Sequence, residues 1–84
     1  MRLRWRWFQS DLHGQHPNEM MSVIVKPGYG CWVLSDFNIH PRTMEQFPAE
    51  VSSISEARRI GRLIILTELE RIKNHPRIKE RGKR

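Results

Sequence analysis

Residues 53–74 read SISEARRIGRLIILTELERIKN and predict one long helix. Ser53 and Glu56 match a capping box, in which each residue satisfies a free backbone N–H of the other. No proline interrupts residues 54–74, and Pro76 stops the helix just beyond them. At roughly 100° per residue, one broad face collects Ile54, Ala57, Ile60, Gly61, Ile64, Ile65, Leu69 and Ile72. Such a face is typical of a helix that packs on a sheet.

Three stretches with the composition of strands precede this helix. Residues 2–9 alternate basic and apolar side chains, and residues 20–26 and 31–37 are rich in β-branched and aromatic residues. The turn at residues 27–30, Pro-Gly-Tyr-Gly, joins the last two into a hairpin. The proline-containing segments between them, residues 10–19 and 38–52, are predicted to be loops, the second with one short turn at residues 43–46.

The predicted fold class is therefore α+β. A three-stranded antiparallel sheet carries one long C-terminal helix on one face, in the order β-β-β-α. Residues 1–76 would form a single domain, and residues 77–84 a basic C-terminal tail.

The alternation at the N-terminus gives this predicted sheet two different faces, because successive side chains of a strand point to opposite sides. Leu3, Trp5 and Trp7 would meet the helix, and a row formed by Arg2, Arg4 and Arg6 would line the open face. The third strand is apolar on both sides, so its pattern does not say which side is buried. An outward Trp32 would place an aromatic ring among the arginines.

The net charge of +6 is concentrated at the two ends of the chain. This distribution favours a polyanionic partner, namely nucleic acid or a nucleoprotein complex. The alternatives are a protein partner with an acidic surface, or a charge that serves solubility alone. The candidate contact residues are Arg2, Arg4, Arg6, Arg58, Arg59, Arg62, Trp32 and Tyr29.

Leu63 and Leu66 lie on the polar side of the predicted helix, where they are either ordinary exposed residues or the contact of a homodimer or protein partner. They lie beside Arg59, Arg62 and Glu70. Arg58, Arg59 and Arg62 cluster in the second and third turns of this helix. These three arginines form either a solvated face or a second strip that contacts phosphates.

Residues that carry chemistry do not assemble into a motif. Cys31, the only cysteine, is expected to be a buried structural residue rather than a nucleophile. His13 and His16 lack the further ligands that a zinc site needs, so neither metal nor cofactor is predicted. We expect a non-enzymatic protein without a signal peptide or membrane span, located in the cytoplasm.

The strand-strand-strand-helix order, with Ser53-Ile54-Ser55-Glu56-Ala57-Arg58-Arg59 opening the helix, resembles the arm-type DNA-binding domains of phage and transposon integrases. Those domains place a three-stranded sheet in the major groove, and the resemblance implies DNA contact through the sheet. In size, charge and topology the chain also resembles stand-alone phage proteins, including several anti-CRISPR inhibitors. That resemblance implies an inhibitor that docks on a nucleoprotein machine or a host protein, in the host cytosol.

Overall fold

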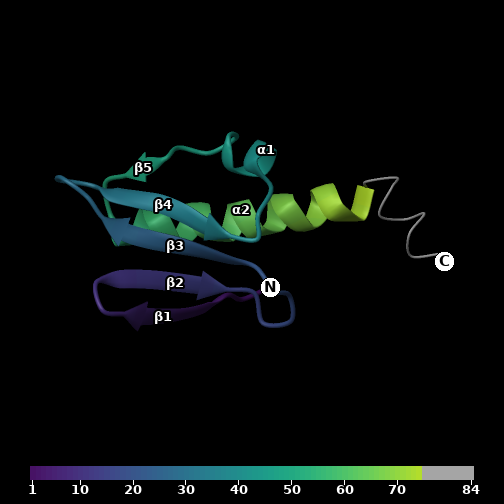
Figure 1. Ribbon diagram of the computed structural model, residues 1–84, viewed down its shortest axis with the longest axis horizontal. Coiled ribbons are helices and arrows are strands. Elements are labelled where there is room, and N and C mark those ends of the chain that lie inside the picture. Colours follow the sequence, from purple (N-terminus) through teal and green to yellow (C-terminus); the bar gives the residue numbers. More distant parts are fainter. Residues whose placement is uncertain (75–84) are drawn as a thin grey trace.

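The computed structural model describes residues 1–74, which form a five-stranded antiparallel sheet with one long helix across one face (Figure 1). The strands lie side by side in chain order, from β1 at one edge to β5 at the other. The elements are β1 (Arg4–Phe8), β2 (Asp11–Gln15), β3 (Ser22–Pro27), β4 (Trp32–Phe37), α1 (Pro41–Met44), β5 (Glu50–Val51) and α2 (Ile54–Asn74). The predicted α+β class and long C-terminal helix are confirmed. The predicted helix stop at Pro76 and the basic tail lie outside the described residues.

The prediction of three strands is wrong, and the largest difference is β2. Its residues were predicted to be part of a loop, yet they pair with β1 on one side and with β3 on the other. The β1–β2 connection is a tight turn through Gln9 and Ser10, in which Gln9 adopts a left-handed φ of 56°. Glutamine is an unusual residue for that conformation, so the turn carries no sequence signal.

The second predicted loop, residues 38–52, also contains regular structure. α1 begins with Pro41 at its first helical position, and His40 caps it because its Nδ1 accepts a hydrogen bond from the Arg42 backbone N–H at 3.1 Å. The chain then returns to the sheet, where β5 pairs with the start of β4. The predicted short turn thus corresponds to α1 and the residues after it, whereas β5 was missed.

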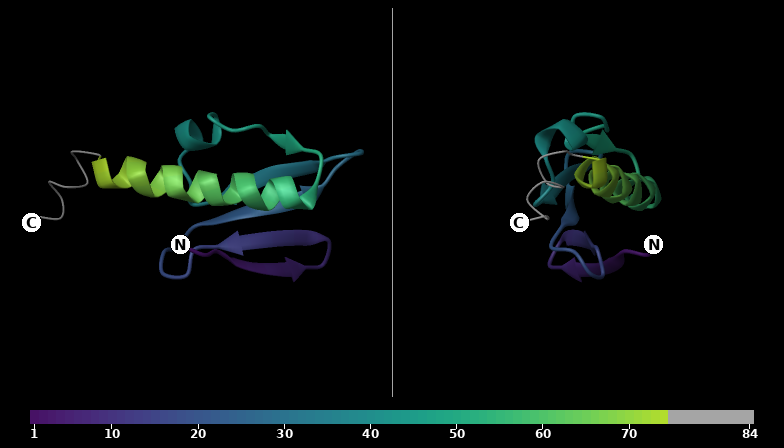
Figure 2. Two further views of the ribbon diagram at one scale, coloured as in Figure 1. Left: turned by 180° about the vertical axis from the view of Figure 1, so that it is seen from behind. Right: turned by 90° about the vertical axis from the view of Figure 1, so that its right-hand side faces the viewer.

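The hydrophobic core lies between α2 and the sheet (Figure 2). α2 packs against β2, β3, β4 and β5, and Val23, Val25, Ile64 and Ile65 are completely buried between these layers. The apolar helix face predicted from periodicity is confirmed at its centre. Leu34 is buried in the same core, so the Trp32 side of β4 faces the helix.

A buried carboxylate joins α1 to α2. Glu68 lies on the inner side of α2 and accepts a hydrogen bond from the hydroxyl of Thr43, itself completely buried, at 2.7 Å. Arg71 donates to both oxygens of the same carboxylate, at 3.0 and 2.9 Å, and the His40 backbone N–H donates at 3.4 Å. Burial raises the pKa of Glu68, but these hydrogen bonds and the charge of Arg71 outweigh it, so the pKa lies below its ordinary value.

This lowered pKa predicts a specific loss of stability in acid. The ionised Glu68 stabilises the fold above the ordinary glutamate pKa, and the contribution disappears as pH falls through the lower pKa of the folded state. Free energies of unfolding from urea titrations at neutral pH and at about pH 3 should therefore show a larger advantage of wild type over Glu68→Gln at neutral pH. An equal advantage at both pH values would contradict this role of the carboxylate.

Candidate nucleic-acid interface

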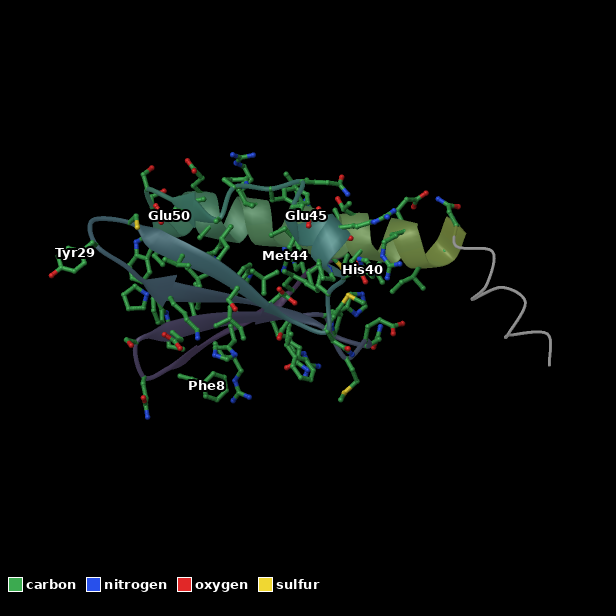
Figure 3. All side chains as sticks on the ribbon, turned by 45° about the horizontal axis from the view of Figure 1, so that its top comes forward. Phe8, Tyr29, His40, Met44, Glu45 and Glu50 are labelled. Carbon is green, nitrogen blue, oxygen red and sulfur yellow. The ribbon has the colours of Figure 1, made fainter. Side chains whose placement is uncertain are left out.

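No helix of the described residues covers the sheet face turned away from α2 (Figure 2). Strand register places Arg6 of β1 beside His13 of β2, and Arg4 beside Gln15. Phe8 ends the β1 row, and Figure 3 shows its side chain on the side of the sheet opposite α2. We call this surface the open face; its members on the first four strands are Arg4, Arg6, Phe8, Asp11, His13, Gln15, Ser22, Ile24, Lys26, Val33, Ser35 and Phe37.

A shallow hollow of about 210 Å³ lies at the β1 end of the open face. The rings of Phe8 and His13 meet edge to face, with centroids 4.8 Å apart. Phe8 nevertheless keeps 54% of its surface exposed, so its ring is accessible to a ligand. The hollow is lined by Arg4, Arg6, Phe8, His13, Gln15 and Ser22.

The arginines of this hollow form no salt bridge with a carboxylate of the described residues. Within residues 1–74 the one salt bridge joins Arg71 to Glu68, on the other side of the molecule. Arg4 and Arg6 are both exposed at the edge strand. Their guanidinium groups are therefore available to an external anion, with an aromatic ring beside them.

The predicted row of three arginines is only partly correct. β1 begins at Arg4, and Arg2 precedes it, lining instead a separate cavity on the helix side together with Arg58 and Arg62. Strand alternation holds only within a strand, so it places Arg4 and Arg6 but not Arg2. Arg59 is exposed but lines neither cavity.

The apolar side of the N-terminal segment also differs from the prediction at its end. Leu3 is buried and Trp5 packs against the core, as predicted, but Trp7 remains 55% exposed. The Trp7 ring meets Trp32 edge to face, with centroids 6.3 Å apart. Trp32 also packs against the core, so the alternative that it lies among the arginines on the open face is wrong.

The other candidate contact residues lie away from the open face. Tyr29 projects from the tip of the β3–β4 hairpin and is fully exposed (Figure 3). Leu63 and Leu66 are exposed on α2, at 39% and 36%. Sequence reasoning missed Phe8, His13 and Phe37, although the same period of two that placed Arg4 and Arg6 on one face also places Phe8 there.

The residues considered for catalysis or metal binding interact with side chains or backbone groups next to them. Cys31 is half-buried rather than buried, and partial burial together with the neighbouring Glu50 raises the pKa of its thiol. His16 accepts two backbone N–H bonds through Nδ1, from Asn18 and Glu19. Among residues 1–74 no three His, Cys, Asp or Glu side chains come together as a metal site would require.

The chain matches no known protein family, no curated protein and no solved structure. None of the helices in the described part has the length and apolar character needed to cross a bilayer. The geometry of the chain itself is therefore the basis for assigning a function.

Proposed function

We propose that this small protein binds single-stranded nucleic acid, alone or within a nucleoprotein complex, through the open face. The observation that carries the proposal is the hollow in which Arg4, Arg6, Phe8 and His13 surround one site on an uncovered sheet. Arginine neutralises phosphates, and exposed aromatic rings on a sheet stack on unpaired bases. The unpaired charge therefore suits the phosphate of a nucleotide, and the exposed rings suit its base.

Phe37 supplies a second ring on the same face. The strand register places Phe8 and Phe37 at opposite corners of the open face. They are separated by three strand spacings across the sheet and by four residues along the strand direction. With ~4.8 Å between strands and ~3.3 Å per residue, the corners are ~20 Å apart. A nucleic-acid strand that follows this diagonal passes His13 and Ile24 and contacts both rings.

Binding should weaken in a characteristic way when the arginines are replaced. For Arg4→Gln/Arg6→Gln, we expect affinity for a single-stranded oligonucleotide to fall about 10- to 100-fold. The slope of log affinity against log salt should drop by about 1.4, because each phosphate contact on a single strand contributes about 0.7. Phe8→Ala should lose about 1–3 kcal/mol with an unchanged slope, since stacking releases no counterions.

Fluorescence anisotropy at several salt concentrations provides the measurement. Arg4→Gln and Arg6→Gln are also measured singly, with Arg59→Gln as their matched control, because it likewise removes one charge from an exposed position, but outside the hollow. An equal loss for Arg59→Gln would contradict a defined site, and a salt slope near zero in wild type would overturn the proposal. Preference for duplex over single strand would contradict the stacking role of Phe8.

A second candidate function is an inhibitor or adaptor that docks on an acidic protein surface. The observation that favours it is the exposed side of α2, where Leu63 and Leu66 lie one turn after Arg59 and Arg62, together with the fully exposed Tyr29. Aromatic and arginine side chains are the usual anchors of protein interfaces. Leu63→Ser/Leu66→Ser should abolish that association, or a homodimer through the same surface, while leaving oligonucleotide affinity unchanged.

A further inference from the structure

A second cavity lies on the helix side of β1, between the N-terminal segment and α2. It is an open cleft of about 610 Å³ lined by Met1, Arg2, Leu3, Trp5, Arg58 and Arg62. Half of these residues are arginines, and none is acidic. The volume is in the range that holds a small ligand.

Trp5 forms the base on which this cleft is built. Its indole ring lies against Gly14 of β2 on one side and Gly61 of α2 on the other, so closely that a Cβ on Gly14 would lie 2.5 Å from the ring. The guanidinium of Arg58 lies over the same ring, 5.4 Å from its centroid. Two glycines therefore fix the ring, and the ring in turn holds Arg58 through a cation–π contact.

Arg62 is held from another direction. Its Nε donates a hydrogen bond to the Met1 backbone oxygen at 3.2 Å, which leaves the two terminal nitrogens of the guanidinium available. Arg58 and Arg62 are four residues apart on one helix, a spacing at which like charges repel. The residues three and four positions away on α2 include no carboxylate that would relieve this repulsion.

We propose that the cleft binds a phosphate monoester through Arg2, Arg58 and Arg62. Three arginines that line one cleft without a carboxylate match a group that carries close to two negative charges, and guanidinium forks suit phosphate oxygens. A phosphodiester carries only one charge and fits the arrangement less well. This site is separate from the open face and does not depend on the function proposed for it. The monoester belongs either to a free phosphorylated small molecule or to the terminal phosphate of a nucleic-acid strand.

The binding test uses inorganic phosphate at about pH 8, where the dianion predominates, followed by amide chemical shifts in NMR. Saturable shifts are expected in residues 2–5 and 58–62 of the wild-type protein. Arg62→Gln and Arg58→Gln should each weaken binding about tenfold or more. Arg59→Gln, the neighbour outside the cleft, should leave it unchanged. Absence of saturable shifts, or an equal loss for Arg59→Gln, would overturn the proposal.

Two further titrations identify the source of the phosphate. An oligonucleotide that binds about tenfold more tightly with a 5′-phosphate than with a 5′-hydroxyl, in wild type but not in Arg62→Gln, identifies a strand terminus. A nucleoside monophosphate that saturates the same amides, with no effect of the 5′-phosphate, identifies a free small molecule. Arg4→Gln/Arg6→Gln should retain phosphate binding in the cleft, so failure of the open-face function and failure of this proposal are distinguishable.

Discussion

Gly14→Ala is expected to destabilise the fold by about 1–3 kcal/mol, although it adds a single methyl group. The new Cβ would lie 2.5–2.8 Å from three carbon atoms of the Trp5 ring. The ring cannot simply retreat, because Gly61 limits the space for it on the helix side, where even a Cβ at Gly61 would lie 3.0 Å away. Thermal unfolding should register a fall of roughly 10 °C in Tm, given about 4–8 °C per kcal/mol for a domain of this size.

Two variants show whether Trp5 is the cause. Gln15→Ala, the next residue of β2, is exposed and should leave Tm nearly unchanged. Trp5→Leu costs stability by itself, but the double variant with Gly14→Ala should be less destabilised than the sum of the two, because the smaller side chain removes the clash. Additive effects would show that Gly14 is needed for its backbone conformation rather than for the space that it leaves to the Trp5 ring.

Glu68→Ala should cost about 2–3 kcal/mol. The substitution removes the carboxylate that accepts hydrogen bonds from Thr43, Arg71 and the His40 backbone. The hydroxyl of Thr43, which has no exposure, loses its partner. The side chain of Arg71 is 29% exposed and can turn to water, which keeps the loss below that of a fully buried ion pair. Urea denaturation provides the free energy of unfolding.

Glu70→Ala is the matched control on the same helix. Glu70 is exposed and accepts a hydrogen bond from Asn74, so its removal should change stability by less than about 0.5 kcal/mol. Hydrogen exchange in Glu68→Ala should increase most in α1, because the carboxylate joins this short helix to α2. Equal losses for Glu68→Ala and Glu70→Ala, with α1 still protected, would contradict the role of this network.

The elements predictable from sequence are those with local signals. The Ser53 cap is one, since its hydroxyl accepts the Glu56 N–H at 3.1 Å, and the periodic face of α2 is another. β2 has no such signal, because Asp11–Gln15 is short and polar and contains Gly14. Its strand conformation depends on partners on both sides, and Gly14 is present because Trp5, nine residues earlier in the chain, occupies the space above it.

The candidate sites also divide into a part with a local sequence signal and a part that depends on contacts between distant segments. Alternation within residues 4–8 is local, so the placement of Arg4 and Arg6 on one face could be predicted. The grouping of Arg2 with Arg58 and Arg62 could not, because it depends on where β1 begins and on how α2 crosses the sheet. The function of both groups remains a proposal that the binding experiments test.

The position of β1 at the border of the sheet has a consequence for solubility. Within residues 1–74 this strand has a neighbour on one side only, so its other side offers unpaired backbone groups to any extended chain. If a second molecule aligned there in antiparallel fashion, arginines of the two copies would be brought close together, and like charges across a strand pair are unfavourable. The arginines proposed to attract a polyanion thus also discourage polymerisation through the sheet border.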